Sequence, residues 1–261
     1  PNHRFRFPRH GGTGAIWDAI ADRLSHAQIH FDCEVIGIDV EARIVRFAGG
    51  REVPYGTLIS TMPLDRLAIL CDRGDWMEWT SGLRHSAVHV VGVGLKGHPS
   101  PELASKCWMY FPEDNAPFYR VTHFSHYSPN NVDDIARHWS LMAEVSESPE
   151  KPVDSDRVAD EVVRGLVATR LIEGADQVTH IWRRRCEYGY PTPSLERDAI
   201  LARIQPALRT AGILSRGRFG AWLYEVGNMD HCYMQGVEAA NHILSGAPEI
   251  TIERPHEVNR A

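Results

Sequence analysis

The middle of the chain alternates short apolar segments with turn-forming residues, and this pattern limits the fold more than any other feature. Val88 to Leu95 is followed by aromatic or β-branched segments at residues 106–111, 118–124, 139–145 and 178–188. Such residues favour pleated strands, and a sheet with one covered face is usually antiparallel. The pattern therefore predicts an antiparallel sheet, interrupted by a helix at residues 156–171.

Helices and strands are mixed on either side of this sheet. Apolar periodicity predicts helices at residues 13–24, 64–70, 76–83 and 234–244, and another from an N-capping Ser194 to Leu208. Strands are expected at residues 29–31, 35–40, 44–47, 57–62 and 218–222, the first three as a small meander. The fold class expected is α/β of the α+β kind.

Charge and composition exclude several functions. The 28 basic and 34 acidic residues give a net charge of −6, the wrong sign for a general binder of nucleic acid or anionic membranes. Apolar runs are shorter than the roughly 20 residues that span a bilayer. The five cysteines are scattered without a CxxC pair, so we expect no metal and a cytoplasmic protein with reduced thiols.

Two glycine-containing turns precede predicted helices. Gly12-Thr13-Gly14 fails as a dinucleotide fingerprint because Trp17 replaces the third glycine and Pro8 breaks the preceding strand. Gly227 and Asn228 precede the last helix, whose free N–H groups could hold a phosphate or a flavin edge. The alternative for each turn is that it only connects a loop to a helix and binds no ligand.

Aromatic residues and one arginine form a further group. Trp108 and Tyr110 are two residues apart on a predicted strand and therefore share a face. An arginine fork beside tyrosine hydroxyls suits a pyrophosphate and a flat base. The alternative for any single aromatic residue is a structural role, in a hydrophobic core or on the surface of the sheet, without ligand binding.

Five strings resemble the eukaryotic type of UDP-galactopyranose mutase, at residues 5–17, 59–62, 106–120, 189–197 and 224–231. The resemblance extends from Phe5 to about Gly246. It implies a flavoprotein of the wider amine-oxidase class. A partial Rossmann-like FAD-binding domain would comprise residues 1–62 and 205–261, and an antiparallel-sheet domain for the nucleotide sugar would comprise residues 63–204.

The resemblance also implies the site residues. Contacts with the UDP-sugar fall on Asn2, Trp108, Tyr110, Arg120, Tyr127, Tyr190, Tyr224 and Asn228. Among them Arg120, Tyr127, Tyr190 and Tyr224 are the expected catalytic residues, which hold the pyrophosphate. FAD contacts fall on Val35, Arg218, Gly227, Asn228, Met229 and Asp230.

The implied reaction interconverts UDP-galactopyranose and UDP-galactofuranose, with N5 of reduced FAD as nucleophile and NAD(P)H as reductant. The family's GxGxxG turn, its His loop and a second UDP-binding arginine do not occur in this sequence, and Met229 and Cys232 stand where Gln and Ser are expected. We therefore expect this chain to be a carboxyl-terminal part of the enzyme. A homo-oligomer is compatible with this expectation. The alternatives are a flavin oxidoreductase of the amine-oxidase class and a non-catalytic remnant that binds UDP or a protein.

Overall fold

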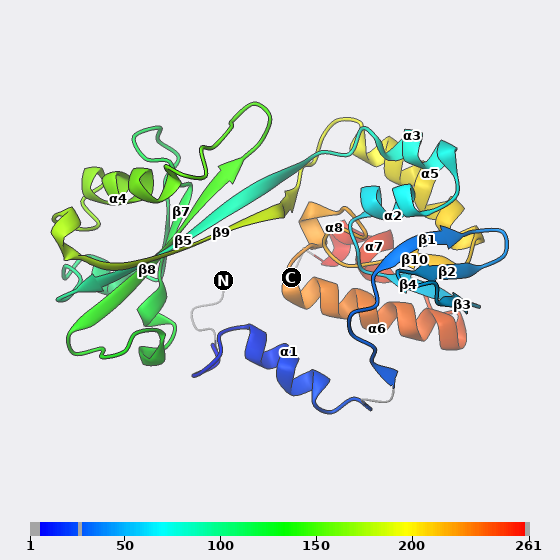
Figure 1. The fold of residues 1–261 in the computed structure, drawn as a ribbon, viewed down its shortest axis with the longest axis horizontal. Coiled ribbons are helices and arrows are strands. Elements are labelled where there is room, and N and C mark those ends of the chain that lie inside the picture. The colour runs from blue at the N-terminus through cyan, green and yellow to red at the C-terminus, as the bar shows by residue number, and fades with distance from the viewer. Residues whose placement is uncertain (1–5, 26–27, 259–261) are drawn as a thin grey trace. The chain divides into compact units, whose positions relative to one another are not determined.

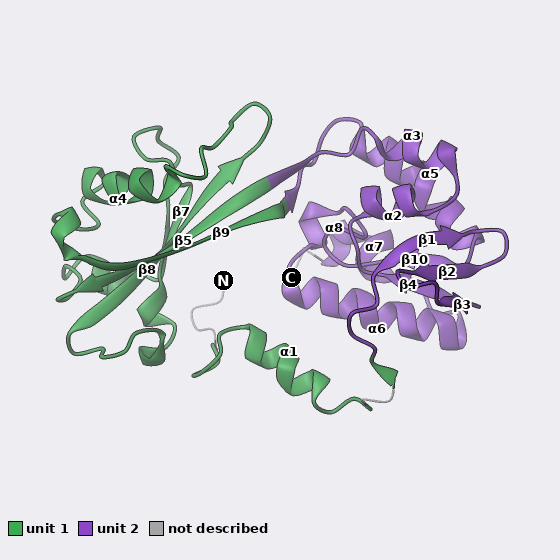
Figure 2. Ribbon diagram, viewed as in Figure 1, with its two compact units in different colours: residues 1–29, 87–189 green, residues 30–86, 190–261 purple. Residues whose placement is uncertain are grey.

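The computed structural model describes residues 6–25 and 28–258, and the chain divides into two compact units (Figure 2). Unit 1 comprises residues 1–29 and 87–189, and unit 2 comprises residues 30–86 and 190–261. This division differs from the predicted domains, since residues 1–29 belong to unit 1 with the sheet, and residues 63–86 and 190–204 belong to unit 2. The reason is packing, because the helices at residues 64–80 contact each other and the helix that begins at Arg197.

Unit 1 is built on one five-stranded sheet, as predicted (Figure 1). Its strand order is β6 (Trp108–Tyr110), β7 (Arg120–His123), β8 (His138–Glu147), β5 (His85–Lys96) and β9 (Val178–Pro191). The pairs β6–β7, β7–β8 and β8–β5 are antiparallel. Unit 1 also contains α1 (Gly14–Ala21), η2 (Leu103–Ser105), η3 (Phe124–His126), η4 (Pro129–Asn131) and η5 (Ala175–Gln177).

One face of this sheet is covered by α4 (Val158–Ala168). Val158, Val162 and Leu166 recur every four residues and are fully buried in one cluster with alternate residues of the strands. Val91, Ala143 and Val121 are register partners within this cluster. The residues that alternate with them therefore lie on the opposite face of the sheet.

His123 ends β7 in a buried position. It is 1% exposed, its ring centroid lies 3.6 Å from that of His126, and its Nδ1 has no hydrogen-bond partner among the described residues. Burial disfavours the charged imidazolium and His126 adds positive charge, which together lower the pKa of His123 from 6.5 to about 4.

We expect His123 to make the protein sensitive to acid. The unfolded chain binds this proton near pH 6.5 but the folded chain only near pH 4, so stability present above pH 6.5 is lost as the pH falls. The loss from this group should be about 2.5 kcal/mol between pH 7 and about 4.5. Urea unfolding at both pH values measures this loss of unfolding free energy. Compared with the parent protein, His123→Phe should lose less, and His98→Gln, at an exposed position, should lose as much. Equal losses in all three proteins would contradict the assignment.

Unit 2 contains two small sheets. β1 (Val35–Asp39), β2 (Ile44–Phe47) and β3 (Glu52–Pro54) form an antiparallel meander. The expected strand at residues 29–31 was wrong, because Phe31 is 79% exposed and β3 takes the third place after the turn at Gly49 and Gly50. β4 (Leu58–Ser60), inside the predicted strand at 57–62, pairs in parallel with β10 (Ile213–Ser215).

Four helices of unit 2 lie near their predicted positions, but the last of these begins at Met229 and not at Met234, and no prediction covered the helices at residues 224–226 and 250–258. The helices of this unit are α2 (Leu64–Leu70), α3 (Gly74–Thr80), α5 (Arg197–Thr210), η6 (Tyr224–Val226), α6 (Met229–Ser245), α7 (Ile250–Glu253) and α8 (Pro255–Val258). Ser194 does not cap α5, whose N-cap is Glu196. The predicted strand at 218–222 was also wrong: this segment turns, with positive φ at Gly217 and Trp222. No helix in the described ranges has the length and apolar character to cross a membrane.

Candidate functional site

The sheet face opposite α4 carries three of the predicted residues. Trp108 is the register partner of Thr122, and Tyr110 is the partner of Arg120. These residues alternate with buried Val121 and therefore lie on the face opposite α4. Trp108 and Tyr110 are 44% and 63% exposed. This face thus presents two partly exposed aromatic rings beside one guanidinium.

Arg120 is held by Glu144, a residue that the sequence analysis missed. The Arg120 Nε and Nη2 atoms donate to Glu144 Oε1 and Oε2 at 2.8 and 2.7 Å. The hydroxyl of Tyr119 donates to Glu144 Oε2 at 2.6 Å. Glu144 is 6% exposed, whereas the Arg120 side chain is 27% exposed. Glu144 could have been identified from the sequence, because it is the acidic residue in the otherwise apolar segment 141–145.

Tyr127 follows η3 and contacts the amino-terminal segment. Its ring centroid lies 4.8 Å from that of Phe7. Nearby, Ser128 Oγ and Asn130 Nδ2 donate to the carbonyl oxygen of Arg9 at 2.6 and 3.0 Å. Burial raises the pKa of the Tyr127 hydroxyl, and a hydrogen bond with Thr122 opposes this rise.

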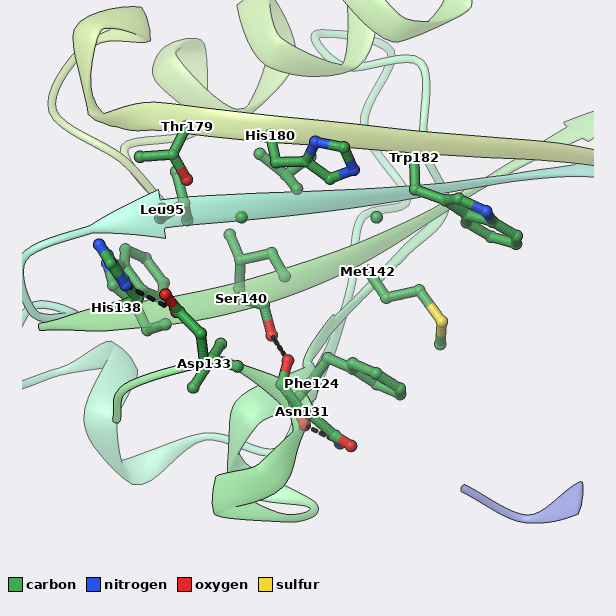
Figure 3. Close-up of a pocket in the computed structure, with 16 residues that line it drawn as sticks. Leu95, Phe124, Asn131, Asp133, His138, Ser140, Met142, Thr179, His180 and Trp182 are labelled. Carbon is green, nitrogen blue, oxygen red and sulfur yellow. Dashed lines mark hydrogen bonds and ion pairs between the residues drawn. The ribbon is translucent and has the colours of Figure 1, made fainter. Parts of the chain in front are cut away.

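A cavity of about 560 Å³ opens on the same sheet face (Figure 3). The register row that begins at Trp108 and Thr122 continues to Met142 and Gly92, which line this cavity. A Cβ on Gly92 would stand 3.8 Å from Trp182, which is ordinary van der Waals contact, so Trp182 lies close to this part of the lining. Figure 3 shows Trp182 coming from β9 and Met142 from β8. The lining suits a flat or apolar group.

In unit 2 the structure brings together Tyr190, Tyr224, Arg218 and Gly227. The ring centroids of Tyr190 and Tyr224 are 6.0 Å apart. Arg218 Cζ lies 4.8 Å from the Tyr190 ring centroid, and Arg218 Nε donates to the Gly227 carbonyl at 2.7 Å. Residues predicted for the substrate and for the cofactor therefore form one cluster.

The start of α6 is the segment for which FAD contacts were predicted. Asn228 is its N-cap but makes no side-chain capping bond, and the first-turn amides of Met229 and Asp230 lack partners within the helix. A Cβ on Gly227 would stand 3.1 Å from Arg218 Cγ and 3.2 Å from the Leu223 carbonyl oxygen, so a larger residue here would have to displace these neighbours. His231 Nδ1 is buried without a hydrogen-bond partner among the described residues.

The remaining predicted residues lie elsewhere or outside the described ranges. Val35 begins β1 opposite Phe47, and Asn2 lies outside the described residues. Trp108, Tyr110, Arg120 and Tyr127 belong to unit 1, whereas Tyr190, Tyr224 and Asn228 belong to unit 2. No group of three His, Cys, Asp or Glu residues in the described part of the chain is arranged to hold a metal ion.

Comparison with known proteins shows the wider class. The solved structure of reduced UDP-galactopyranose mutase matches 97% of this chain and 55% of its own, with 43% identity and a TM-score of 0.92. The chain thus spans about half the length of that mutase. A CLA-producing fatty acid isomerase from P. acnes, at 14% identity, matches 85% of this chain and 49% of its own with a TM-score of 0.59, which shows the fold alone.

The fold predicted from sequence is confirmed by these matches, since the chain combines helices with an antiparallel sheet as flavin amine-oxidase-like proteins do. The profile of the flavin containing amine oxidoreductase family matches residues 2–244. Because this match covers most of the sequence, the chain belongs to the flavin containing amine oxidoreductase family.

Proposed function

We propose that this protein acts in the interconversion of UDP-galactopyranose and UDP-galactofuranose. The observation that carries the proposal is the 43% identity with UDP-galactopyranose mutase over 97% of this chain. The aromatic and arginine groups of the site support it, because a diphosphate leaving group needs a cation and hydroxyl donors.

Unit 1 supplies the positive charge for the diphosphate. Arg120 is partly exposed on the face opposite α4, where its buried register partner Glu144 orients it. A guanidinium held in advance stabilises the negative charge that develops on the leaving diphosphate without reorganising during the reaction. Trp108 and Tyr110 would lie along the nucleotide, and Tyr127 would donate its hydroxyl hydrogen.

Unit 2 supplies neutral donors and the cofactor contacts. Tyr190 and Tyr224 would donate hydrogen bonds to the diphosphate, and Asn228 would bind the sugar. Arg218, Gly227 and the first-turn amides of α6 would hold the flavin ring edge. Bound reduced FAD supplies a nucleophilic nitrogen for the anomeric carbon. NAD(P)H is the proposed reductant and the cytoplasm the proposed location.

Turnover tests this function. The complete gene product, supplied with FAD and reduced by dithionite, should convert UDP-galactofuranose to UDP-galactopyranose, as followed by ion-pair chromatography. The same protein with oxidised FAD is the control and should be inactive. No conversion under reducing conditions, with flavin bound, would rule out the proposal.

The apolar cavity at Gly92 and Trp182 favours a second candidate, oxidation of an apolar amine by the flavin. Release of hydrogen peroxide on addition of amines, without conversion of the UDP-sugar, would favour this oxidoreductase function. The partly exposed Arg120 argues against it, because an amine carries no negative charge for a guanidinium to bind.

We expect Tyr190→Phe to weaken UDP binding by about 0.5 to 1.5 kcal/mol, since the change removes one neutral donor and keeps the ring. Isothermal titration with UDP measures the effect. Tyr233→Phe, at an exposed position of α6, is the control and should leave the affinity unchanged. A loss for Tyr190→Phe as large as that for Arg120→Ala would mean that the two roles are assigned wrongly.

A further inference from the structure

An ion pair joins the two segments of unit 2 that carry Tyr190 and Tyr224. Arg197 is the first residue of α5 and follows the end of β9, where Tyr190 lies. Its Nη1 and Nη2 donate to Glu225 Oε2 and Oε1 at 2.8 and 3.0 Å. Glu225 directly follows Tyr224 in η6. The ion pair therefore links the segments of the two tyrosines whose rings are 6.0 Å apart.

Helix stability does not explain this arginine. The first turn of a helix favours acidic residues, because the helix dipole is positive there. Arg197 is also only 8% exposed, and a buried charge is costly unless it is paired. Its Nε makes one more bond, to Asp198 Oδ1 at 2.8 Å. The guanidinium is thus held rigidly, with two donors directed at Glu225.

The rest of the Tyr224 segment is fixed without Arg197. Trp222 and Val226 are both 0% exposed, and Gln235 Nε2 donates to the Val226 carbonyl at 3.0 Å. Between these anchors, Tyr224 is 54% exposed. Core packing thus fixes the path of the segment, and the bond from Arg197 to Glu225 restrains its exposed part.

We propose that Arg197 is a positioning residue that, through Glu225, holds Tyr224 at the spacing from Tyr190 needed for both hydroxyls to bind one diphosphate. This inference rests on the proposed function. Bidentate pairing fixes orientation as well as distance, which a single lysine ammonium cannot do. Arg197 itself does not contact the substrate in this proposal.

Two measurements on the whole chain test the proposal. In the absence of ligand, NMR of ring-labelled tyrosine should show a cross-peak between the Tyr190 and Tyr224 rings. Arg197→Met and the isosteric Glu225→Gln should weaken this cross-peak, and Arg197→Lys should retain part of it. In UDP titrations, Arg197→Met should bind roughly twofold to tenfold more weakly, as expected for the loss of one neutral donor. Tyr224→Phe should then add little to Arg197→Met, since the hydroxyl is already misplaced.

Arg209→Met is the matched control, because it removes an ion-paired guanidinium from the last turn of the same helix, where the partners are Glu249 and Glu253. It should change neither measurement. An unchanged cross-peak and UDP affinity in folded Glu225→Gln and Arg197→Met would overturn the proposal, as would equal effects in Arg209→Met. If the parent chain does not bind UDP but Arg197→Met loses the cross-peak, positioning is supported and the proposed function fails.

Discussion

Arg120→Ala is expected to lower both the affinity for UDP and the free energy of unfolding, by about 2 to 4 and 2 to 3 kcal/mol respectively. The affinity falls because the diphosphate loses its charged donor. Stability falls because the Glu144 carboxylate, only 6% exposed, loses both bonds from Arg120. The partial exposure of Arg120 keeps this loss below that of a fully buried pair.

The double variant Arg120→Ala/Glu144→Gln separates the two effects. A glutamine amide still accepts from the Tyr119 hydroxyl but carries no charge, so the unfolding free energy should recover by about half or more. UDP affinity should remain as low as in the single variant. Isothermal titration and urea unfolding measure the two quantities. Recovery of UDP binding in the double variant, or unchanged binding in Arg120→Ala, would show that this arginine is purely structural.

The 261-residue chain, produced alone, is expected to purify colourless and to bind FAD only weakly. Family resemblance places FAD contacts at a glycine-rich turn over the pyrophosphate and at the carboxyl-terminal turn, and this sequence has only the second. The pyrophosphate contacts are charge-assisted hydrogen bonds worth about 1.5 to 3 kcal/mol each, so the affinity should fall by at least about a thousandfold relative to a protein with both turns.

Quenching of flavin fluorescence measures this residual affinity. Arg218→Met should weaken it further, because Arg218 holds the Gly227 carbonyl beside the start of α6. Arg203→Met, whose guanidinium stacks on Trp79 at 3.9 Å, is the control and should leave the affinity unchanged. A yellow, monomeric preparation with stoichiometric flavin would contradict the prediction.

Local sequence determined the elements whose side chains repeat with a clear period. The predicted bounds of β2 and α2 agree with the structure, and all five strands of the unit 1 sheet lie where alternating apolar residues placed them. These elements could be predicted because strand and helix preferences depend on neighbouring residues and on one buried face. The long strings shared with the mutase family likewise lie in the sequence itself.

Tertiary structure decided which residues meet. The third strand of the meander is β3 instead of residues 29–31, because pairing with β2 outweighs the apolar character of Ile29 and Phe31. The pairing of Arg120 with Glu144 follows from the β7–β8 register, which places residues 24 positions apart side by side. The contact between Arg197 and Glu225, 28 positions apart, likewise depends on the tertiary fold that brings the start of α5 to η6. Such contacts depend on packing between distant segments, which no local pattern of side chains records.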